Sequence, residues 1–374
     1  MTFREMTLAV FEGRRVPHVL FQPRIEPWLE LHERQGTLPQ EVRGLSVRDV
    51  FDRIGASMRY IDYYTGRPSP LEERFDDEVT IVEQSTQRSR TRRFETPHGD
   101  LTQTEQLTVD GTWRTTEFAA KSVDDLAALR WLLERRAFRF DPETFAAGDA
   151  WIGPRGVGQF FVPKSPYLAL AQQWMPFDGF IYALADAPDR VEEVMRAIDA
   201  SYDSLYEQLT DSEVRVLNFG ENIAEAYLSP RYLEQYLLPW YTKRCGNLRE
   251  AGIFTHVHID GYFRSLLPYL ADLPFDGLEA LTPRPQGDVS LEEIGENIGD
   301  KVLLDGIPAV FFLSHHPREQ LEQCVEELIR RFSPRLILGI SDELPQGGDE
   351  ESYQRLRWVA DRCREISPAG DPPQ

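Results

Sequence analysis

Cysteine is scarce in this chain, with three residues among 374. Cys245, Cys324 and Cys363 cannot all pair, and none of them stands in the Cys-x-x-Cys arrangement that is typical of zinc or redox sites. Each one fits the apolar stripe of an expected helix, where a free cysteine behaves as a small buried hydrophobe. We therefore expect all three thiols to be core residues.

Positive charge is also in short supply. The chain has 62 acidic and 41 basic residues, which gives a formal net charge of −21. This disfavours binding to nucleic acids, whose phosphates must be neutralised by Lys and Arg, and binding to an anionic membrane. The acidic surface is typical of a soluble protein that avoids non-specific association. Because a secretory signal and an apolar run of transmembrane length are both lacking, we expect a cytoplasmic protein.

Glycine-rich nucleotide-binding loops are missing after every expected strand, which argues against an open doubly wound sheet. Short apolar or β-branched runs alternate with amphipathic segments of helical period, and this alternation predicts parallel strands with helical crossovers. The eight candidate strands are 16–20, 79–82, 157–161, 214–219, 253–257, 277–280, 302–304 and 335–340. Eight strands favour a single α/β domain with the (β/α)₈ TIM-barrel fold over residues 1–366.

Two stretches depart from this rhythm. Residues 84–121 contain the run from Thr91 to Leu101 and the turn sequence Val109-Asp110-Gly111-Thr112, which together predict an N-terminal β-hairpin insertion in the barrel. Residues 367–374 are rich in Pro and Gly, and we expect a disordered tail there.

Function in barrel enzymes collects at the carboxyl ends of the strands. Polar residues at these ends are therefore the candidates for an active site. They are Gln22 and Arg24, Glu83, Asn218, Glu221 and Asn222, His256, His258 and Asp260, Glu279, Asp305, and Ser341 to Glu343.

The run from His256 to Gly261 carries the strongest signal. His256, His258 and Asp260 occupy alternate positions, so they project to one side of an extended chain. Imidazole and carboxylate together suit zinc or another divalent ion, and Glu279 on the next strand would complete a four-coordinate site. The alternative is that one histidine hydrogen-bonds within the barrel rim while Asp260 caps a turn before Gly261.

The other candidates have two readings as well. Asn218, Glu221 and Asn222 surround a glycine at a strand end, which fits either substrate binding or an N-cap of the following helix. Asp342, after the last strand, fits a metal ligand, a general acid or base, or a helix start.

Two arginines are candidates for gripping a substrate carboxylate. Arg24 has the geometry to do so with two parallel hydrogen bonds. Arg59 is flanked by aromatic residues from Tyr60 to Tyr64, which pack either on a flat ligand or in the core; the core reading is favoured.

Several motifs in the second half of the chain, taken in order, resemble the uroporphyrinogen decarboxylase superfamily. They are 229–233 (SPRYL), 238–241 (LPWY), 258–261 (HIDG), 287–289 (GDV) and 338–341 (LGIS). That superfamily includes corrinoid-dependent methyltransferases and is related to cobalamin-independent methionine synthase. The resemblance implies a TIM barrel and covers most of the chain.

Methyltransferases of this group hold zinc on a His-x-Cys pair and a later Cys, with a Glu ligand in the methionine synthase branch. The resemblance places His258 on the family histidine, Asp260 on the first cysteine and Glu279 close to the glutamate. The last cysteine falls near Ser341 or Asp342. Both thiolates are thus replaced, which departs from the family pattern, and His256 becomes an additional expected ligand.

The resemblance implies a methyltransferase that moves a methyl group from a small methoxylated or methylated compound to a corrinoid on a separate carrier protein, assisted by a divalent metal, with zinc favoured. His256, His258 and Glu279 are the expected metal ligands, and Asp342, Glu221 and Asp260 the expected catalytic residues. Substrate contacts are expected from Gln22, Arg24, Arg59, Asn218 and Asn222. The alternative is a metal-free decarboxylase for an acidic or tetrapyrrole-like substrate, although the arginine cluster of those enzymes is only partly present. A homodimer is compatible with the sequence.

Overall fold

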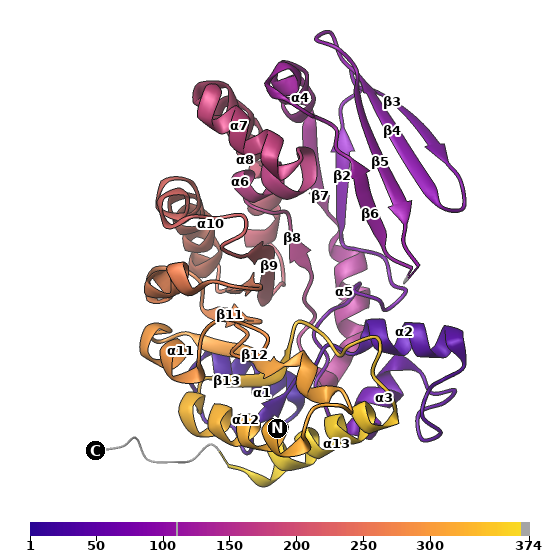
Figure 1. The fold of residues 1–374 in the computed structure, drawn as a ribbon, viewed down its shortest axis with the longest axis vertical. Coiled ribbons are helices and arrows are strands. Elements are labelled where there is room, and N and C mark those ends of the chain that lie inside the picture. Colours follow the sequence, from indigo (N-terminus) through magenta and orange to yellow (C-terminus); the bar gives the residue numbers. More distant parts are fainter. Residues whose placement is uncertain (110, 368–374) are drawn as a thin grey trace. The chain divides into compact units, whose positions relative to one another are not determined.

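A computed structural model describes residues 1–109 and 111–367 of the chain. The described residues fall into two compact units (Figure 1). Unit 1 consists of Met1–Pro70, Pro142–Val162 and Glu213–Gln374, and unit 2 of Leu71–Asp141 and Pro163–Ser212. Most of the tail predicted at 367–374 lies outside the described residues. Within them, no helix has the length and apolar character needed to span a membrane.

Unit 1 is built on a parallel sheet of seven strands in the order β1-β13-β12-β11-β10-β9-β8. Every pairing in this sheet is parallel. The strands are β1 (Leu20–Phe21), β8 (Phe161–Val162), β9 (Val216–Ile223), β10 (Phe254–Ile259), β11 (Gly277–Glu279), β12 (Val302–Pro308) and β13 (Leu336–Ser341). All residues of β11, β12 and β13 are buried, as expected for a parallel sheet covered on both faces.

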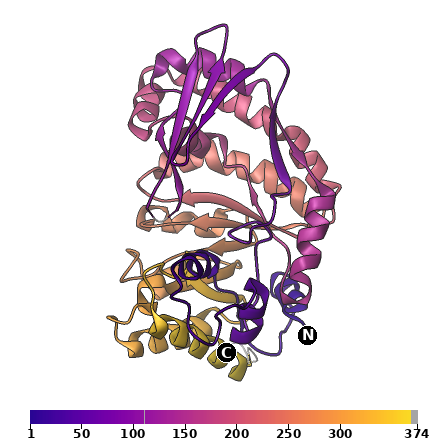
Figure 2. The ribbon, with the colours of Figure 1, turned by 90° about the vertical axis from the view of Figure 1, so that its right-hand side faces the viewer.

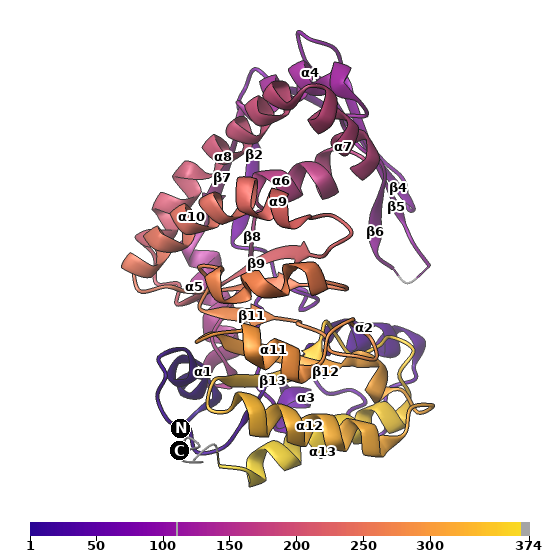
Figure 3. The ribbon, with the colours of Figure 1, turned by 60° about the vertical axis from the view of Figure 1, so that its left-hand side comes forward.

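Helices connect and cover these strands, as the alternation in the sequence predicted (Figure 3). They are α1 (Phe3–Phe11), α2 (Glu26–Gln35), α3 (Val47–Ile54), α5 (Pro142–Ile152), α9 (Pro230–Tyr232), α10 (Leu238–Glu250), α11 (Leu291–Asn297), α12 (Arg318–Phe332) and α13 (Glu350–Glu365). Short helical segments η2 (Gly153–Arg155), η4 (Leu233–Leu237), η5 (Arg264–Asp272) and η6 (Ala309–Phe312) complete the unit. Cys245 on α10 and Cys363 on α13 are buried and Cys324 on α12 is half-buried; all three are free thiols, as predicted.

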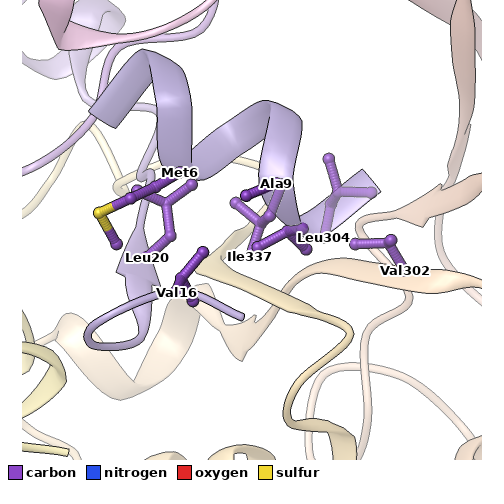
Figure 4. Packing of buried hydrophobic residues seen from close by; sticks show 8 residues of the cluster. Met6, Ala9, Val16, Leu20, Val302, Leu304 and Ile337 are labelled. Carbon is purple, nitrogen blue, oxygen red and sulfur yellow. The ribbon is translucent and has the colours of Figure 1, made fainter. Parts of the chain in front are cut away.

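Helix α1 illustrates how sequence produces this packing. Thr2 accepts from the backbone N–H of Glu5, and the Glu5 carboxylate accepts from the N–H of Thr2, so a capping box begins the helix. The apolar face of α1 then packs against the ends of three strands, where Figure 4 shows Met6 and Ala9 beside side chains from β1, β12 and β13.

The backbone of residues 57–61 hydrogen-bonds at both edges of the seven-stranded sheet. The N–H of Ser57 donates to the carbonyl of Phe21 beside β1, over 2.8 Å. Tyr60 forms a parallel bridge with Gln159, just before β8. The prediction that 79–82 forms the second strand of the barrel is wrong, because β3 in this region belongs to an antiparallel sheet in unit 2.

Unit 2 contains two antiparallel sheets and the helices beside them (Figure 2). The larger sheet has the order β3-β4-β5-β6. The stretch 84–121, predicted as one hairpin, holds β4, β5 and β6 of this sheet and the end of β3. The strands are β2 (Leu71–Phe75), β3 (Thr80–Ser85), β4 (Ser89–Glu95), β5 (Leu101–Leu107), β6 (Trp113–Glu117) and β7 (Arg136–Phe140). The helices are η1 (Val123–Asp125), α4 (Leu126–Leu133), α6 (Pro166–Ala169), η3 (Leu170–Trp174), α7 (Phe177–Asp186) and α8 (Pro188–Thr210).

Candidate active site

Strand register in unit 1 brings the predicted residues of three strands together. His258 on β10 lies opposite Glu279 on β11, and His256 lies opposite Asn218 on β9. Because His256 and His258 are two residues apart on one strand, both imidazoles face the Glu279 carboxylate. Nδ1 of His256 is 3.1 Å from Oε2 of Glu279, and Nδ1 of His258 is 3.7 Å from Oε1. All four side chains are almost fully buried.

Glu279 is the centre of this cluster. Its Oε1 accepts from Nη1 of Arg59 over 2.7 Å and from the Tyr60 hydroxyl over 2.9 Å. Its Oε2 accepts from the Asn218 amide and contacts His256. Burial alone would raise the pKa of this carboxyl, but the positive charge of Arg59, with the nearby imidazoles of His256 and His258 and the charge of Arg24, holds the pKa well below its ordinary value. Glu279 is therefore a fixed, ionised carboxylate.

Arg59 is held on every side by protein groups. Besides Glu279, its guanidinium donates to Asp305 over 2.8 Å and 3.3 Å, and to the side chain and carbonyl of Gln22. Burial raises the pKa of the Asp305 carboxyl above its ordinary value, while Arg59 opposes that rise. Since all three nitrogens of Arg59 are engaged and the residue is buried, neither it nor Gln22 offers a free group to substrate in this arrangement.

Arg24 and Asp342 form the second part of the cluster. Nε of Arg24 donates to the carbonyl of Asp342, and Nη2 donates to its Oδ1 over 2.6 Å. Nη1 of Arg24 lies 3.8 Å from Oε1 of Glu279. Asp342 is also 3.9 Å from Nε2 of His258, and its side chain is 49% exposed. Asp342 therefore connects the buried cluster to solvent.

The backbone is strained at the carboxyl ends of β9, β11 and β13 and within β12. Asn222, Ala280, Asp305 and Asp342 have positive φ values of 52°, 60°, 74° and 74°. Residues other than glycine rarely adopt this conformation, and such residues gather at active sites. The strain lies next to the cluster on β9, β11, β12 and β13.

Five buried polar atoms of this region have no hydrogen-bond partner within the described residues. They are Nδ1 of His256, Nδ1 of His258, Oδ1 of Asn218, Nε2 of Gln159 and Oγ of Ser341. Buried polar atoms are nearly always satisfied in folded proteins, so a group of exceptions in one place points to a ligand that supplies the missing bonds.

Three further predicted residues are Asp260, Asn222 and Glu221. Asp260 is exposed, and its carboxylate accepts from the N–H of Gly261 over 2.7 Å. This contact agrees with the alternative interpretation, in which Asp260 caps a turn before Gly261. Asn222 is exposed. Glu221 is buried, and its charge adds to the rise that burial causes in the pKa of Cys245, to about 12. The roles of Asp260, Asn222 and Glu221 stay predictions.

Sequence reasoning missed two members of the cluster. Tyr60, expected in the core, donates to Glu279, and its ring stacks on Phe161 at 4.7 Å between centroids. Gln159 contacts Nε2 of His256 over 2.7 Å. Both residues sit on the short bridge between 57–61 and β8, where no apolar run marks a strand. The sequence feature that could have marked this segment was the charged residue Arg59 among aromatic residues.

The donors do not fit a zinc ion in this arrangement. Among the described residues, no group of three His, Cys, Asp or Glu side chains is arranged to hold a metal. A metal on Glu279 would displace hydrogen bonds from Arg59, Tyr60 and Asn218. It would also sit beside two guanidinium groups, and each pair of unit charges about 4 Å apart repels by about 4 kcal/mol at an effective dielectric constant of about 20.

The architecture of unit 1 defines an α/β protein of TIM-barrel-like fold with an ionisable cluster at the carboxyl ends of its strands. Comparison with solved structures gives the same fold. A methyltransferase from Methanosarcina mazei is similar with a TM-score of 0.60 and 14% sequence identity, over 97% of this chain and 99% of that one. A putative vitamin-B12-independent methionine synthase from Listeria monocytogenes gives a TM-score of 0.49 and 13% identity, over 93% and 96% of the two chains.

At this level of identity the likeness shows the fold alone, and it agrees with a TIM-barrel-like fold. Closure into a ring of eight strands and the N-terminal hairpin insertion stay predictions. No model of a protein family matches the sequence. No curated protein matches it either.

Proposed function

We propose that this protein is a methyltransferase that removes a methyl group from a small methylated or methoxylated compound. The observation that carries the proposal is the cluster around Glu279, with unpartnered buried atoms on His258, Asn218 and Ser341. The likeness in fold to a methyltransferase supports the reaction class. The sequence motifs support it independently, because they resemble a superfamily that contains such enzymes.

The residues of the cluster have distinct tasks in this reaction. When a methyl group leaves a heteroatom, negative charge develops on that atom, and a hydrogen-bond donor aimed at it lowers the barrier. His258 is suited to give this atom a proton, because both of its ring nitrogens lack a hydrogen bond within the described residues. Glu279 and Asp342 flank the imidazole at 3.7 Å and 3.9 Å.

The acceptor that we propose is a corrinoid carried by a separate protein, which would take up the methyl group as a second substrate. Zinc was the expected assistant, but because the donors around Glu279 do not fit it, no step here uses a metal. The proposal takes unit 1 as a closed barrel in which residues 57–61 fill the place between β1 and β8. A closed ring directs side chains from all strands toward one centre.

Decarboxylation of an acidic substrate has less support. That reaction would use Arg24 and Arg59 to hold substrate carboxylates, and Arg59 is already bound by Gln22, Glu279 and Asp305. Release of carbon dioxide is the measurement that distinguishes decarboxylation from methyl transfer.

The test uses the purified protein with free cob(I)alamin as acceptor and a panel of methyl ethers, methylamines and methyl thioethers as donors. We expect the absorbance change of cobalamin methylation with at least one donor class. His258→Ala should abolish it, whereas His98→Ala, which removes an exposed histidine in unit 2, should not. Absence of methylation with every donor, together with carbon dioxide release from acidic compounds, would replace this proposal by the lyase.

A further inference from the structure

Arg24 and His258 converge on the same two carboxylates. Nη1 of Arg24 is 3.8 Å, and Nδ1 of His258 is 3.7 Å, from Oε1 of Glu279. On the other side, Nη2 of Arg24 is 2.6 Å, and Nε2 of His258 is 3.9 Å, from Oδ1 of Asp342. The guanidinium and the imidazole therefore lie side by side between the ends of β11 and β13.

Both groups have donors that no atom of the described residues uses. Nε and Nη2 of Arg24 are anchored by Asp342, which fixes the direction of the whole planar group. Its Nη1 makes no hydrogen bond within residues 1–109 and 111–367; the carboxylate oxygen at 3.8 Å is too distant. His258, whose side chain is 5% exposed, likewise makes no hydrogen bond in that part of the chain.

We propose that Arg24 and His258 form an oxyanion-binding pair and that the methyl donor is therefore an O-methylated compound. The guanidinium of Arg24 then supplies the positive charge that a metal ion was expected to supply. This inference rests on the proposed methyltransferase function. It goes further by naming the donor class and the residue that stabilises the leaving atom.

The chemistry of the step is an in-line displacement at the methyl carbon. The C–O bond breaks and its electron pair stays on the oxygen, while the acceptor supplies the pair that forms the new bond to carbon. The charge on the oxygen is stabilised by the N–H of Arg24 Nη1, and the proton that it finally takes comes from His258. Solvent then returns a proton to His258 on the side of the half-exposed Asp342.

Other donor classes fit these two groups less well. A methylammonium nitrogen has no lone pair to accept a hydrogen bond, and its positive charge would lie beside the guanidinium of Arg24. A thioether sulfur is only a weak acceptor. An ether or ester oxygen accepts from both Arg24 and His258, and its acceptor strength grows as the negative charge develops.

The experiment measures methyl transfer to cob(I)alamin from a series of ring-substituted methoxybenzenes whose phenols differ in pKa. Arg24→Gln should lower the rate by about 10²-fold to 10³-fold, the usual effect of losing one oxyanion donor. It should also make the rate depend more steeply on the pKa of the leaving phenol, because the enzyme no longer stabilises the charge. Arg14→Gln removes an exposed arginine of unit 1 and should change neither quantity.

A purely structural role for Arg24 predicts a uniform loss of rate with an unchanged slope, and that result overturns the inference. If Arg24→Gln does not fold, Arg24→Lys provides the same comparison, since lysine keeps the charge but not the fixed planar donor. Turnover of methylamines or thioethers but not of ethers would also overturn it while leaving the proposed function intact. If no donor class is turned over, the proposed function fails and the inference falls with it.

Metal analysis gives a readout that does not depend on activity. We expect metal in the purified protein to be substoichiometric and unchanged in His258→Ala. One metal ion per chain, lost in that variant, would show that the positive charge comes from a metal after all.

Discussion

The Arg59–Glu279 pair should couple two otherwise independent substitutions. Glu279→Gln keeps the shape of the side chain but removes its charge, which leaves Arg59 with Asp305 as its remaining buried anion. Removing one partner of a buried ion pair costs about 3 to 5 kcal/mol. We expect about 3 kcal/mol here, because the Gln oxygen still accepts from Arg59 and Tyr60. Arg59→Met should cost about 4 kcal/mol, because two buried carboxylates then lack their cation.

The double variant should be more stable than the sum of the two losses predicts. In Glu279→Gln/Arg59→Met both charges of this pair are removed and only Asp305 lacks its cation, so we expect a coupling free energy of about 2 kcal/mol or more. Because the chain has two units, hydrogen exchange of β10 and β11 peptides is the better assay, since it reports on unit 1 alone. The exposed pair Glu12–Arg14 serves as control, with an expected coupling below about 1 kcal/mol. Additivity within about 0.5 kcal/mol at the buried pair would refute the reasoning.

Two further substitutions test the surroundings of the cluster. Burial raises the pKa of Glu26 from 4.5 to about 7, so the folded chain binds an extra proton between these values and its free energy of unfolding falls as pH rises through them. Glu26→Gln has no carboxyl to titrate, so its free energy of unfolding does not fall in this way. In thermal unfolding, the stability of the variant relative to the wild type should therefore be about 3 kcal/mol greater at pH 8 than at pH 4. An equal difference at both pH values would contradict this. In Gly339→Ala the new Cβ would lie 2.3 Å from the Asp305 carboxylate, and urea unfolding should show a loss of about 1 to 3 kcal/mol. Gly246→Ala on α10 meets nothing within 4 Å and should gain up to about 1 kcal/mol; if the two alanine variants behave alike, the close approach at Gly339 does not matter.

The strands of the second half were predictable because burial on both faces gives them long apolar runs. The runs at 214–219, 253–257, 302–304 and 335–340 correspond to β9, β10, β12 and β13. The prediction failed at 79–82, where the residues form a strand of the wrong kind. β3 is only partly buried and pairs antiparallel with β4, and its apolar residues did not distinguish it from a barrel strand.

Residues 57–61 show the opposite failure. They hydrogen-bond at both sheet edges, but Arg59 interrupts their apolar character. This interruption is itself part of the site, because a buried guanidinium needs carboxylates, and Glu279 and Asp305 satisfy it. A search for apolar runs therefore does not detect residues 57–61, because a buried ion pair lies at their centre.

The clustering of the candidate residues on β10 and β11 was predictable from the sequence, but their bonding was not. Alternation along β10 correctly directs His256 and His258 to one side, and the register brings Glu279 to them. Whether Glu279 faces a metal or a guanidinium depends on Arg59, whose contact with it no local spacing reveals. Asp260 was grouped with the histidines by the same alternation, but the strand ends at Ile259 and the backbone turns away at Gly261, where φ is 60°.

The pairing of β1 with β13 has a consequence for how this protein is made. Leu20 and Phe21 find their partners, Ile337 and Leu338, only in the last strand of the chain. During synthesis the apolar residues of α1 and β1 therefore emerge long before the strand that covers them, and contacts between such distant segments form slowly. A chain cut short before Leu336 would carry an early segment with an uncovered apolar face, and we expect it to depend on chaperones or to aggregate. The order of synthesis thus makes the final strand the step that completes the sheet of unit 1.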